Sequence, residues 1–148
     1  MTSENIEKIA KKFFVLLDPK VKVSISDKNG FWISVESEDS GRLIGKMGET
    51  LESIQYLLRM MVAKEANEFI PLTVDVADYK GKRVAELEEL AVLMAENVKN
   101  SGYAQEMRPM SAYDRRVVHT ALQNFEGIKA YSVGEGNLRR IKVEKTED

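Results

Sequence analysis

The sequence predicts an α+β protein built from two small units, one over residues 1–78 and the other over residues 79–148. Segments with an apolar residue every three or four positions, typical of helices, are interleaved with short segments in which every second residue is apolar, typical of strands. Turn-forming pairs such as Asn29-Gly30 join neighbouring strands directly, which favours antiparallel hairpins. A chain of 148 residues, 43% of them hydrophobic, has the length for one ordinary domain or two small ones.

The first three elements are a helix and a β-hairpin. We expect an amphipathic helix over residues 4–17 with Ser3 as its N-cap. The apolar residues that identify it recur at helical spacing: Ile6, Ile9, Ala10, Phe13, Phe14 and Leu17. Apolar and polar residues then alternate over 21–26 and again over 31–37, with the Asn29-Gly30 turn between them, so two antiparallel strands follow.

The rest of the first unit is predicted to form two helices and a third strand. A short helix over 38–44 leads into a glycine-containing loop, and a long helix runs from 49 to about 67. The expected core face of the long helix is Leu51, Ile54, Leu58 and Met61. A strand over 71–78 alternates apolar residues at Leu72, Val74 and Val76. The order of the unit is therefore α-β-β-α-α-β.

The second unit is predicted to consist of helices that cover a small, mostly antiparallel sheet. Helices are expected over 82–99 and 111–123, a short strand within 104–109, and a hairpin of strands over 129–133 and 138–145. The expected core face of the first of these helices is Val84, Leu87, Leu90, Ala91, Met94 and Val98. The unit is therefore a small α+β domain with a three-stranded sheet and two helices.

Composition narrows the classes of partner and compartment. The net charge is −2, divided as −3 before residue 79 and +1 after it, so nucleic-acid binding would depend on a few well-placed cations. No segment approaches the ~20 consecutive apolar residues that cross a bilayer. The absence of cysteine suits a reducing compartment. The N-terminus carries Glu4 and Glu7 and no long apolar run, so it does not resemble a signal peptide, and we expect a cytoplasmic protein.

A glycine-containing loop precedes the long helix and carries positive charge. Its residues are Gly41, Arg42, Gly45, Lys46 and Gly48. The spacing excludes a Walker loop, because Gly41 is one residue too close to Gly45-Lys46 and Met47 stands where Ser or Thr is required. It also differs from the dinucleotide pattern. The remaining G-x-x-G lets a sugar-phosphate backbone approach the first amides of the helix, which carry partial positive charge. A tight interhelical turn without a ligand is the alternative.

The order of elements, together with the segment GRLIGKMGETLESIQ, resembles the type II KH domain over residues 1–78. The resemblance implies a three-stranded sheet with its helices on one face. It also implies a loop that clamps about four nucleotides of single-stranded RNA or DNA. The residues that it assigns to this contact are Arg42, Ile44, Gly45, Lys46, Met47 and Gly48.

The last predicted helix carries the only histidine, His119, four residues after Arg115. At ~100° per residue the two side chains share one stripe, with Arg116 further round. Ser111 and Asp114 form a capping box at the start of this helix. A solvated helix face with a partly buried histidine is the alternative reading. One histidine without cysteine or a Ser-His-acid arrangement predicts no catalytic site, no metal site and no cofactor.

The segment MRPMSAYDRRVVHTALQ is similar to the R-three-H signature, an arginine and a histidine separated by three residues, of a domain associated with single-stranded nucleic acids. The resemblance assigns contacts to Arg115 and His119, with the guanidinium placed to meet phosphate. Tyr113, in the first turn, either stacks on a base or packs under the helix. We expect basic neighbours on the same surface: Arg108, Arg116, Arg140 and Lys142.

A type II KH domain followed by an Arg-x-x-x-His domain resembles the bacterial Jag (SpoIIIJ-associated) family over nearly the whole chain. The resemblance implies a cytoplasmic regulator, linked to cell elongation, division or sporulation, that binds single-stranded RNA, with single-stranded DNA as the other possible ligand. It also implies a small stand-alone KH protein as a partner. Many members carry a further N-terminal domain and charged linker, whereas here the KH helix is expected to begin at residue 4, so the role of that domain is not expected here.

These observations combine into one hypothesis with two rivals. Two weak sites, the glycine loop and Arg115, would hold one unpaired strand and gain affinity by acting together. The first rival is a protein-interaction scaffold on a KH fold without nucleic-acid binding, which the positive charge of Arg42 and Lys46 disfavours. The second is an enzyme acting on nucleic acid, which lacks support because no pair of carboxylates has a spacing suited to metal-assisted hydrolysis near either segment.

Overall fold

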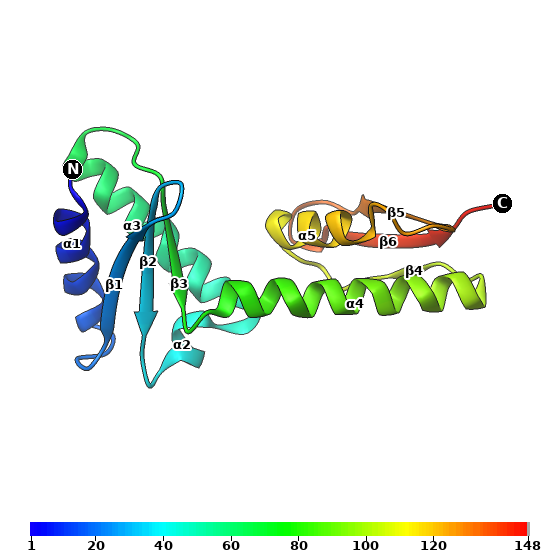
Figure 1. The fold of residues 1–148 in the computed structure, drawn as a ribbon, viewed down its shortest axis with the longest axis horizontal. Helices are drawn as coiled ribbons and strands as arrows, with labels where there is room; N and C mark the ends of the chain where they lie inside the picture. Colours follow the sequence, from blue (N-terminus) through cyan, green and yellow to red (C-terminus); the bar gives the residue numbers. More distant parts are fainter. Residues whose placement is uncertain (148) are drawn as a thin grey trace. The chain divides into compact units, whose positions relative to one another are not determined.

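A computed structural model describes residues 1–147 and confirms the predicted α+β class. The chain divides into two compact units, one over Met1–Lys80 and the other beginning at Gly81. Each unit has its own three-stranded sheet and its own helices (Figure 1). None of the helices in residues 1–147 combines the length and apolar character that a membrane crossing needs.

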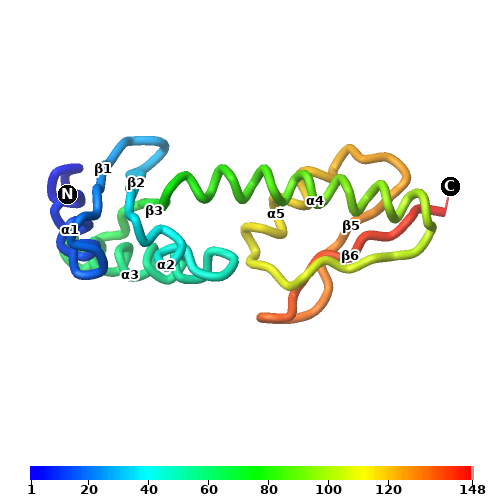
Figure 2. Tube along the Cα trace, turned by 90° about the horizontal axis from the view of Figure 1, so that it is seen from below, coloured from blue at the N-terminus to red at the C-terminus, as the bar shows by residue number. Residues whose placement is uncertain are grey.

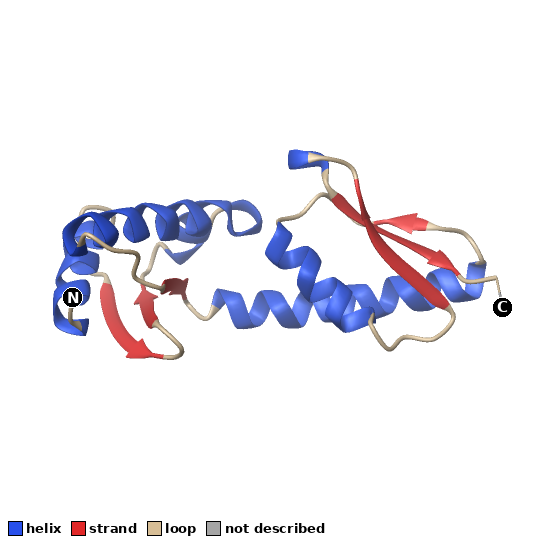
Figure 3. Cartoon of the chain, turned by 90° about the horizontal axis from the view of Figure 1, so that it is seen from above, coloured by secondary structure: helices blue, strands red, loops and turns tan. Residues whose placement is uncertain are grey.

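The first unit has the predicted order α-β-β-α-α-β. Its elements are α1 (Ser3–Val15), β1 (Lys22–Asp27), β2 (Phe31–Glu36), α2 (Ser40–Ile44), the 3₁₀ helix η1 (Lys46–Gly48), α3 (Glu49–Ala66) and β3 (Leu72–Val76). In the sheet order β1-β2-β3, the first two strands form an antiparallel hairpin and β2 pairs with β3 in parallel. A parallel pair needs a long crossover, which α2 and α3 supply. The helices lie on one face of the sheet (Figure 3), as in a type II KH domain.

Three differences from the prediction concern where helices begin and which residues they bury. The N-cap of α1 is Thr2, whose hydroxyl accepts from the Asn5 amide, so Ser3 is already helical and was wrongly assigned. The short helix α2 begins at Ser40 rather than at residue 38. On α3 the predicted core residue Met61 is exposed and Val62 is buried in its place.

The core of the first unit lies between its sheet and its helices. The strands contribute Ile33, Val35, Leu72, Val74 and Val76. The helices contribute Ile6, Ala10, Phe14, Leu43, Leu51, Ile54, Leu58 and Val62. Because α2 is anchored by its single buried residue, Leu43, while α3 is anchored by four buried residues, the loop between them is held at both ends.

The chain passes from β3 into α4 through a short turn (Figure 2). Ala77 and Asp78 both take left-handed backbone angles, with φ of 51° and 56°. The buried carboxylate of Asp75 accepts hydrogen bonds from the amides of Val76 (2.9 Å) and Lys80 (3.1 Å), and so holds the first turn of α4. Burial raises the pKa of Asp75. The ammonium of Lys80 donates to Oε1 of Gln55 on α3.

The second unit consists of two helices on one face of an antiparallel sheet. Its elements are α4 (Tyr79–Ser101), β4 (Gln105–Glu106), α5 (Ala112–Leu122), β5 (Ile128–Val133), the 3₁₀ helix η2 (Gly136–Leu138) and β6 (Arg140–Lys145). The strand order is β4-β6-β5, with both pairings antiparallel. Helix α4 begins three residues earlier than predicted, because the Asp75 carboxylate satisfies its first turn.

One core joins the helices and the sheet of the second unit. Its buried residues are Leu87, Ala91, Ala95, Val98, Met107, Val118, Leu122, Ile128, Ile141 and Val143. Leu90, a predicted core residue of α4, is exposed. Its position ~100° from the centre of the buried stripe explains the difference, since Ala95 completes the stripe instead.

Candidate nucleic-acid interface

The G-x-x-G turn is sterically fixed by its two glycines. Gly45 has φ of 73°, and a Cβ there would lie 2.2 Å from Oγ1 of Thr50. Gly48 has φ of 79°, and a Cβ there would lie 2.8 Å from Cε1 of Tyr79. Both backbone conformations are ones that side-chain-bearing residues rarely adopt. The glycines are therefore required by the turn itself, whether or not a ligand binds.

Between the glycines, Lys46 and Met47 form an exposed tip. Met47 also has a left-handed φ of 54°, which is strained for a residue with a side chain, and such strain gathers at ligand sites. Within residues 1–147, neither the Lys46 amide nor the Met47 amide donates a hydrogen bond. The N-cap of α3 is Gly48, which provides no side chain to the first amides of that helix. The tip thus offers donors and a cation to an anion.

Two acidic residues oppose this charge. Glu49 and Glu52 occupy the first turn of α3 and are exposed. With Ser53, Tyr56 and Leu57 they line a shallow hollow on the outer side of the helix. Carboxylates in a first turn stabilise the helix dipole and repel a phosphate, so a strand is expected to contact the tip rather than this side of α3.

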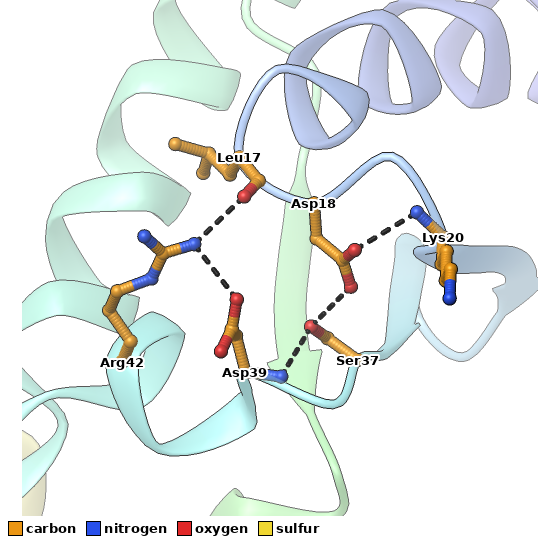
Figure 4. A network of polar contacts seen from close by, with 6 residues as sticks. All are labelled: Leu17, Asp18, Lys20, Ser37, Asp39 and Arg42. Carbon is orange, nitrogen blue, oxygen red and sulfur yellow. Dashed lines mark hydrogen bonds and ion pairs between the residues drawn. The ribbon is translucent and has the colours of Figure 1, made fainter.

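The predicted flanks of the loop differ in their freedom. Ile44 is half buried and packs against the core, so it contributes apolar surface beside the tip. Arg42 is turned toward the end of α1, where its Nη2 donates to the Leu17 carbonyl (2.8 Å) and to Asp39 (3.1 Å) (Figure 4). One nitrogen of the guanidinium is thereby engaged, and its other donors are left for a ligand.

A neighbouring network fixes the segment that precedes α2. Asp18 accepts from the Ser37 hydroxyl (2.7 Å) and from the Lys20 amide (2.9 Å), and the Ser37 hydroxyl accepts from the Asp39 amide (Figure 4). The hydrogen bond from Ser37 holds the pKa of Asp18 below its usual range. The network ties the start of α2 to the end of α1, and so supports the G-x-x-G turn from behind.

In the second unit, Arg115 and His119 lie on one stripe of α5, as predicted, and both are partly buried. The Nη1 of Arg115 donates to the Met110 carbonyl. The Nε2 of His119 lies 3.1 Å from Oγ of Ser132 on β5. Burial lowers the pKa of His119, and the positive charges of Arg115 and Arg139 lower it further. The imidazole is therefore neutral at pH 7 in the absence of a ligand.

Helix α5 is positioned by a cap and an ion pair. Ser111 is the N-cap and accepts from the Asp114 amide, which is the first half of the predicted capping box. The Asp114 carboxylate serves a different partner: Nε and Nη2 of Arg83 on α4 both donate to its Oδ2 at 3.3 Å. The pair is nearly buried, and it joins the helix that carries Arg115 and His119 to α4.

Two of the predicted neighbours of Arg115 lie on the wrong face of the sheet. Arg140 pairs with Val133 and Lys142 with Tyr131 in the β5·β6 register, whereas the strand residue that contacts His119 is Ser132. Because side chains alternate between faces along a strand, Arg140 and Lys142 point away from the helices. They are also neutralised, by Glu106 at 2.7 Å and by Glu144 at 3.4 Å. The expectation that they extend the Arg115 surface was wrong.

The remaining predicted residues are exposed. Arg108 and Arg116 are open to solvent, and Tyr113 is 54% exposed at the first turn of α5 rather than packed under it. Sequence reasoning missed Arg139 and Ser132, which approach His119 from the β5–β6 hairpin. Alternation along a predicted strand would have identified Ser132, but the irregular hairpin end gives no pattern that selects Arg139. Residues 1–147 contain no group of three or more His, Asp or Glu side chains arranged to hold a metal ion.

Comparison with known proteins gives two family matches. Residues 3–74 match the family described as KhpA/KhpB, KH domain, and residues 85–145 match the R-three-H domain. The first match contains the G-x-x-G turn and the second contains Arg115 and His119.

Three relatives named RNA-binding protein KhpB are similar along most of this chain. The relative from Clostridium symbiosum is 33% identical over 140 residues, which are 95% of this chain and 63% of the relative. The relative from Bacillus subtilis (strain 168) is 30% identical over 111 residues, 74% of this chain and 53% of the relative. One from Streptococcus pneumoniae is 24% identical over 151 residues, 97% of this chain and 46% of the relative. The chain therefore spans about half to two thirds of the length of these curated relatives.

Proposed function

Because the chain belongs to the KhpB/Jag family, we propose that it binds single-stranded RNA through the G-x-x-G turn of its KH domain and through Arg115 and His119 of its Arg-x-x-x-His domain. The relatives carry the name RNA-binding protein, and this chain has both domains that the family matches define. The observation that carries the proposal is the exposed Lys46-Met47 tip, whose amides donate to no other group within residues 1–147.

The proposed contact is to the sugar-phosphate backbone. The tip provides two amides and the Lys46 ammonium to phosphate, while Gly45 and Gly48 permit the close packing against Thr50 and Tyr79 that fixes the turn. Half-buried Ile44 gives the bases an apolar neighbour. Contacts of this kind position a strand without reading its sequence, so sequence preference is expected to be modest.

The two domains together would raise the affinity of a chain with a net charge of −2. If both engage one strand, the second contact becomes intramolecular and affinity rises by ~10²-fold or more over either site alone. Few phosphates are neutralised in this scheme. The slope of log K against log salt is then small, about −0.7 for each phosphate contacted.

The test is the charge-reversing variant Lys46→Asp/Met47→Asp, measured by fluorescence anisotropy with an unstructured labelled RNA. Binding is expected to fall by at least about tenfold with the melting temperature unchanged, because both side chains are exposed. Met60→Asp/Lys64→Asp is the matched control, since it makes the same chemical change at exposed positions further along α3. Equal affinity of the tip variant and the wild type would exclude the KH turn as the binding site.

Arg115→Gln tests the second domain. It is expected to weaken binding and to leave the melting temperature within a few degrees of the wild type, because the Met110 carbonyl that it releases is only partly buried. If the variant is much less stable but its folded fraction binds RNA with unchanged affinity, Arg115 stabilises the domain and does not contact the RNA.

We further propose a cytoplasmic regulatory role without catalysis, linked to cell elongation, division or sporulation, as the family resemblance implies. Nucleic acid recovered with the protein after cross-linking in cells would identify its targets and show whether they are RNA or DNA. A nuclease assay with added magnesium tests the absence of catalysis. Cleavage that the tip variant also abolishes would contradict a purely binding role.

A second candidate function is pairing with another protein, and the outer face of α3 favours it. Four apolar residues recur there at helical spacing and are exposed: Tyr56 (64%), Leu57 (48%), Met60 (53%) and Met61 (41%). An exposed apolar stripe of this kind is typical of an interaction surface. A small stand-alone KH protein is the partner that the family resemblance implies.

The Met60→Asp/Lys64→Asp variant separates the two functions. It is expected to lose pairing with a stand-alone KH protein in size-exclusion chromatography with light scattering, and to keep RNA affinity. The tip variant is expected to do the reverse. Loss of both properties in either variant would mean that RNA binding depends on pairing.

A further inference from the structure

Six arginines have hydrogen-bond or ion-pair partners among the described residues, and these partners divide them into two kinds. Those that pair with carboxylates are Arg42, Arg83 and Arg140. Those that donate to backbone carbonyls only, among the described residues, are Arg59, Arg115 and Arg139. A backbone carbonyl carries no net negative charge to offset the charge of the arginine that it holds, so that arginine remains available to an anion. Of these three, Arg115 and Arg139 belong to the same unit.

The backbone of Met110 links these two arginines. Its carbonyl accepts from Nη1 of Arg115, and its amide donates to the Arg139 carbonyl at 3.2 Å. Helix α5 and the end of the β5–β6 hairpin therefore meet at one residue. Arg139 lies in a different part of the chain from the Arg-x-x-x-His segment, so the residue spacing within that segment does not reveal Arg139.

The hairpin holds Arg139 in place before any ligand arrives. Its Nη1 donates to the Gly134 carbonyl at 2.8 Å, and its amide donates to the Gly136 carbonyl at 3.2 Å. The hydrogen bond to the Gly134 carbonyl fixes the Arg139 side chain against the turn between β5 and β6. A guanidinium fixed in this way loses little further freedom on binding, which favours affinity.

The charges that face His119 come from two elements and have one sign. Arg115 approaches along α5 and Arg139 from the hairpin, and both lower the pKa of His119. From β5, the group in contact is the uncharged hydroxyl of Ser132. The one acid of the hairpin turn, Glu135, is exposed to solvent. Two arginines around a neutral histidine form a cationic centre that lacks a counter-charge.

We propose that Arg139 and Arg115 form a clamp for a single backbone phosphate, with Ser132 positioning His119 against the same anion. The proposal rests on the proposed function and adds Arg139 as a third binding residue of the Arg-x-x-x-His domain. The two guanidiniums supply several N–H donors to one phosphate. The phosphate supplies the negative charge that the centre lacks, so His119 takes up a proton more readily when the strand is bound.

Arg139→Gln tests the clamp, and Arg140→Gln is a matched control one residue away. Both variants remove one positive charge, but Arg140 is already paired with Glu106 on the other face of the sheet. Anisotropy with the unstructured RNA should show about tenfold weaker binding for Arg139→Gln, a salt slope smaller by about 0.7, and less than a twofold change for Arg140→Gln. Equal effects of the two variants would overturn the clamp, because they would reflect net charge alone.

The single histidine provides an independent readout by NMR, since its Cε1–H signal reports the pKa of one known group. In the free protein, Arg139→Gln should raise that pKa by removing a neighbouring positive charge. Adding RNA to the wild type should also raise it. If Arg139→Gln leaves the pKa of His119 unchanged in the folded protein, the two residues are not juxtaposed and the proposal fails.

The outcomes distinguish this proposal from the function on which it rests. If the tip variant and Arg115→Gln lose RNA binding while Arg139→Gln does not, the function stands and the clamp is wrong. If the wild type binds no RNA, the proposed function fails and inorganic phosphate becomes the probe. A phosphate-induced rise in the pKa of His119 that Arg139→Gln abolishes would then support the clamp, and no rise would overturn it.

Discussion

Removing the Asp114 carboxylate should destabilise the second unit more than any exposed substitution on α5. The side chains of Arg83 and Asp114 are 18% and 10% exposed, so Asp114→Ala leaves a largely buried guanidinium without its main partner. Breaking such a pair costs about 3–5 kcal/mol of unfolding free energy. Both hydrogen bonds are long, at 3.3 Å, and end on the same oxygen, and Glu86 lies 3.9 Å from Arg83 as a substitute. These features place the expected cost near the lower limit, about 3 kcal/mol.

The assay is thermal unfolding followed by two signals. A loss of about 3 kcal/mol corresponds to a fall in melting temperature of roughly 12–24 °C for a domain of this size. Circular dichroism includes the helices of the second unit, while the only tryptophan, Trp32, lies in the first. We expect the dichroism transition to shift and the Trp32 fluorescence transition to stay.

Two further variants determine whether the lost pair is the cause. Glu86→Ala removes the exposed partner of Arg83 and should change stability by less than about 0.5 kcal/mol. The double variant Arg83→Met/Asp114→Ala removes the stranded charge and should recover part of the loss. If Asp114→Ala is within about 1 kcal/mol of the wild type, the ion pair does not fasten α5 to α4 and the reasoning is refuted.

Two other predictions concern the first unit. Gly45→Ala forces a methyl group against Thr50 at a φ of 73°, and should lower the free energy of unfolding, measured by urea denaturation, by roughly 2–4 kcal/mol. A loss below about 1 kcal/mol would mean that the turn relaxes easily. Lys80 has a pKa lowered to about 8, first by burial and also by Arg59, while Asp75 and Glu52 act in the opposite direction. Between about pH 8 and pH 10.5 the unfolded chain therefore binds more protons than the folded one, and stability should rise with pH in that window. Lys80→Met should remove this rise in unfolding free energies measured at about pH 7.5 and 9.5, and identical profiles would contradict the shift.

The element order was predictable because each element carries its own periodicity. The errors arose where a periodic stripe allows two choices. With Leu51, Ile54 and Leu58 on the core side, Met61 and Val62 continue the stripe at opposite margins at ~100° per residue. The half-buried Gln55 and Arg59 lie on the Val62 side, so the buried face extends toward Val62 and away from Met61. Leu90 failed for the same reason on α4. Hydrophobicity alone favoured the larger side chains, whereas the angle determined burial.

The candidate site was predictable only where one short segment contains it. The G-x-x-G turn and the Arg115–His119 stripe are local in sequence, so spacing identifies them. The partners that tune them come from distant segments. Asp75 reaches the first turn of α4, Arg83 reaches Asp114 across 31 residues, and Arg139 approaches His119 from the last hairpin. No periodicity encodes these approaches, because they depend on how the elements pack.

The sorting of arginines also supports the proposed binding of a polyanion by a chain with a net charge of −2. Net charge counts every cation, but a phosphate is attracted to those whose charge is not already cancelled nearby. Carboxylates cancel Arg83 and Arg140, which serve the architecture of the second unit, whereas backbone carbonyls orient Arg115 and Arg139 without cancelling them. A carbonyl is therefore the partner that can hold a binding arginine ready. The matched pair Arg139→Gln and Arg140→Gln tests this distinction at nearly the same sequence position and with the same formal charge, while the partner and the face of the sheet differ.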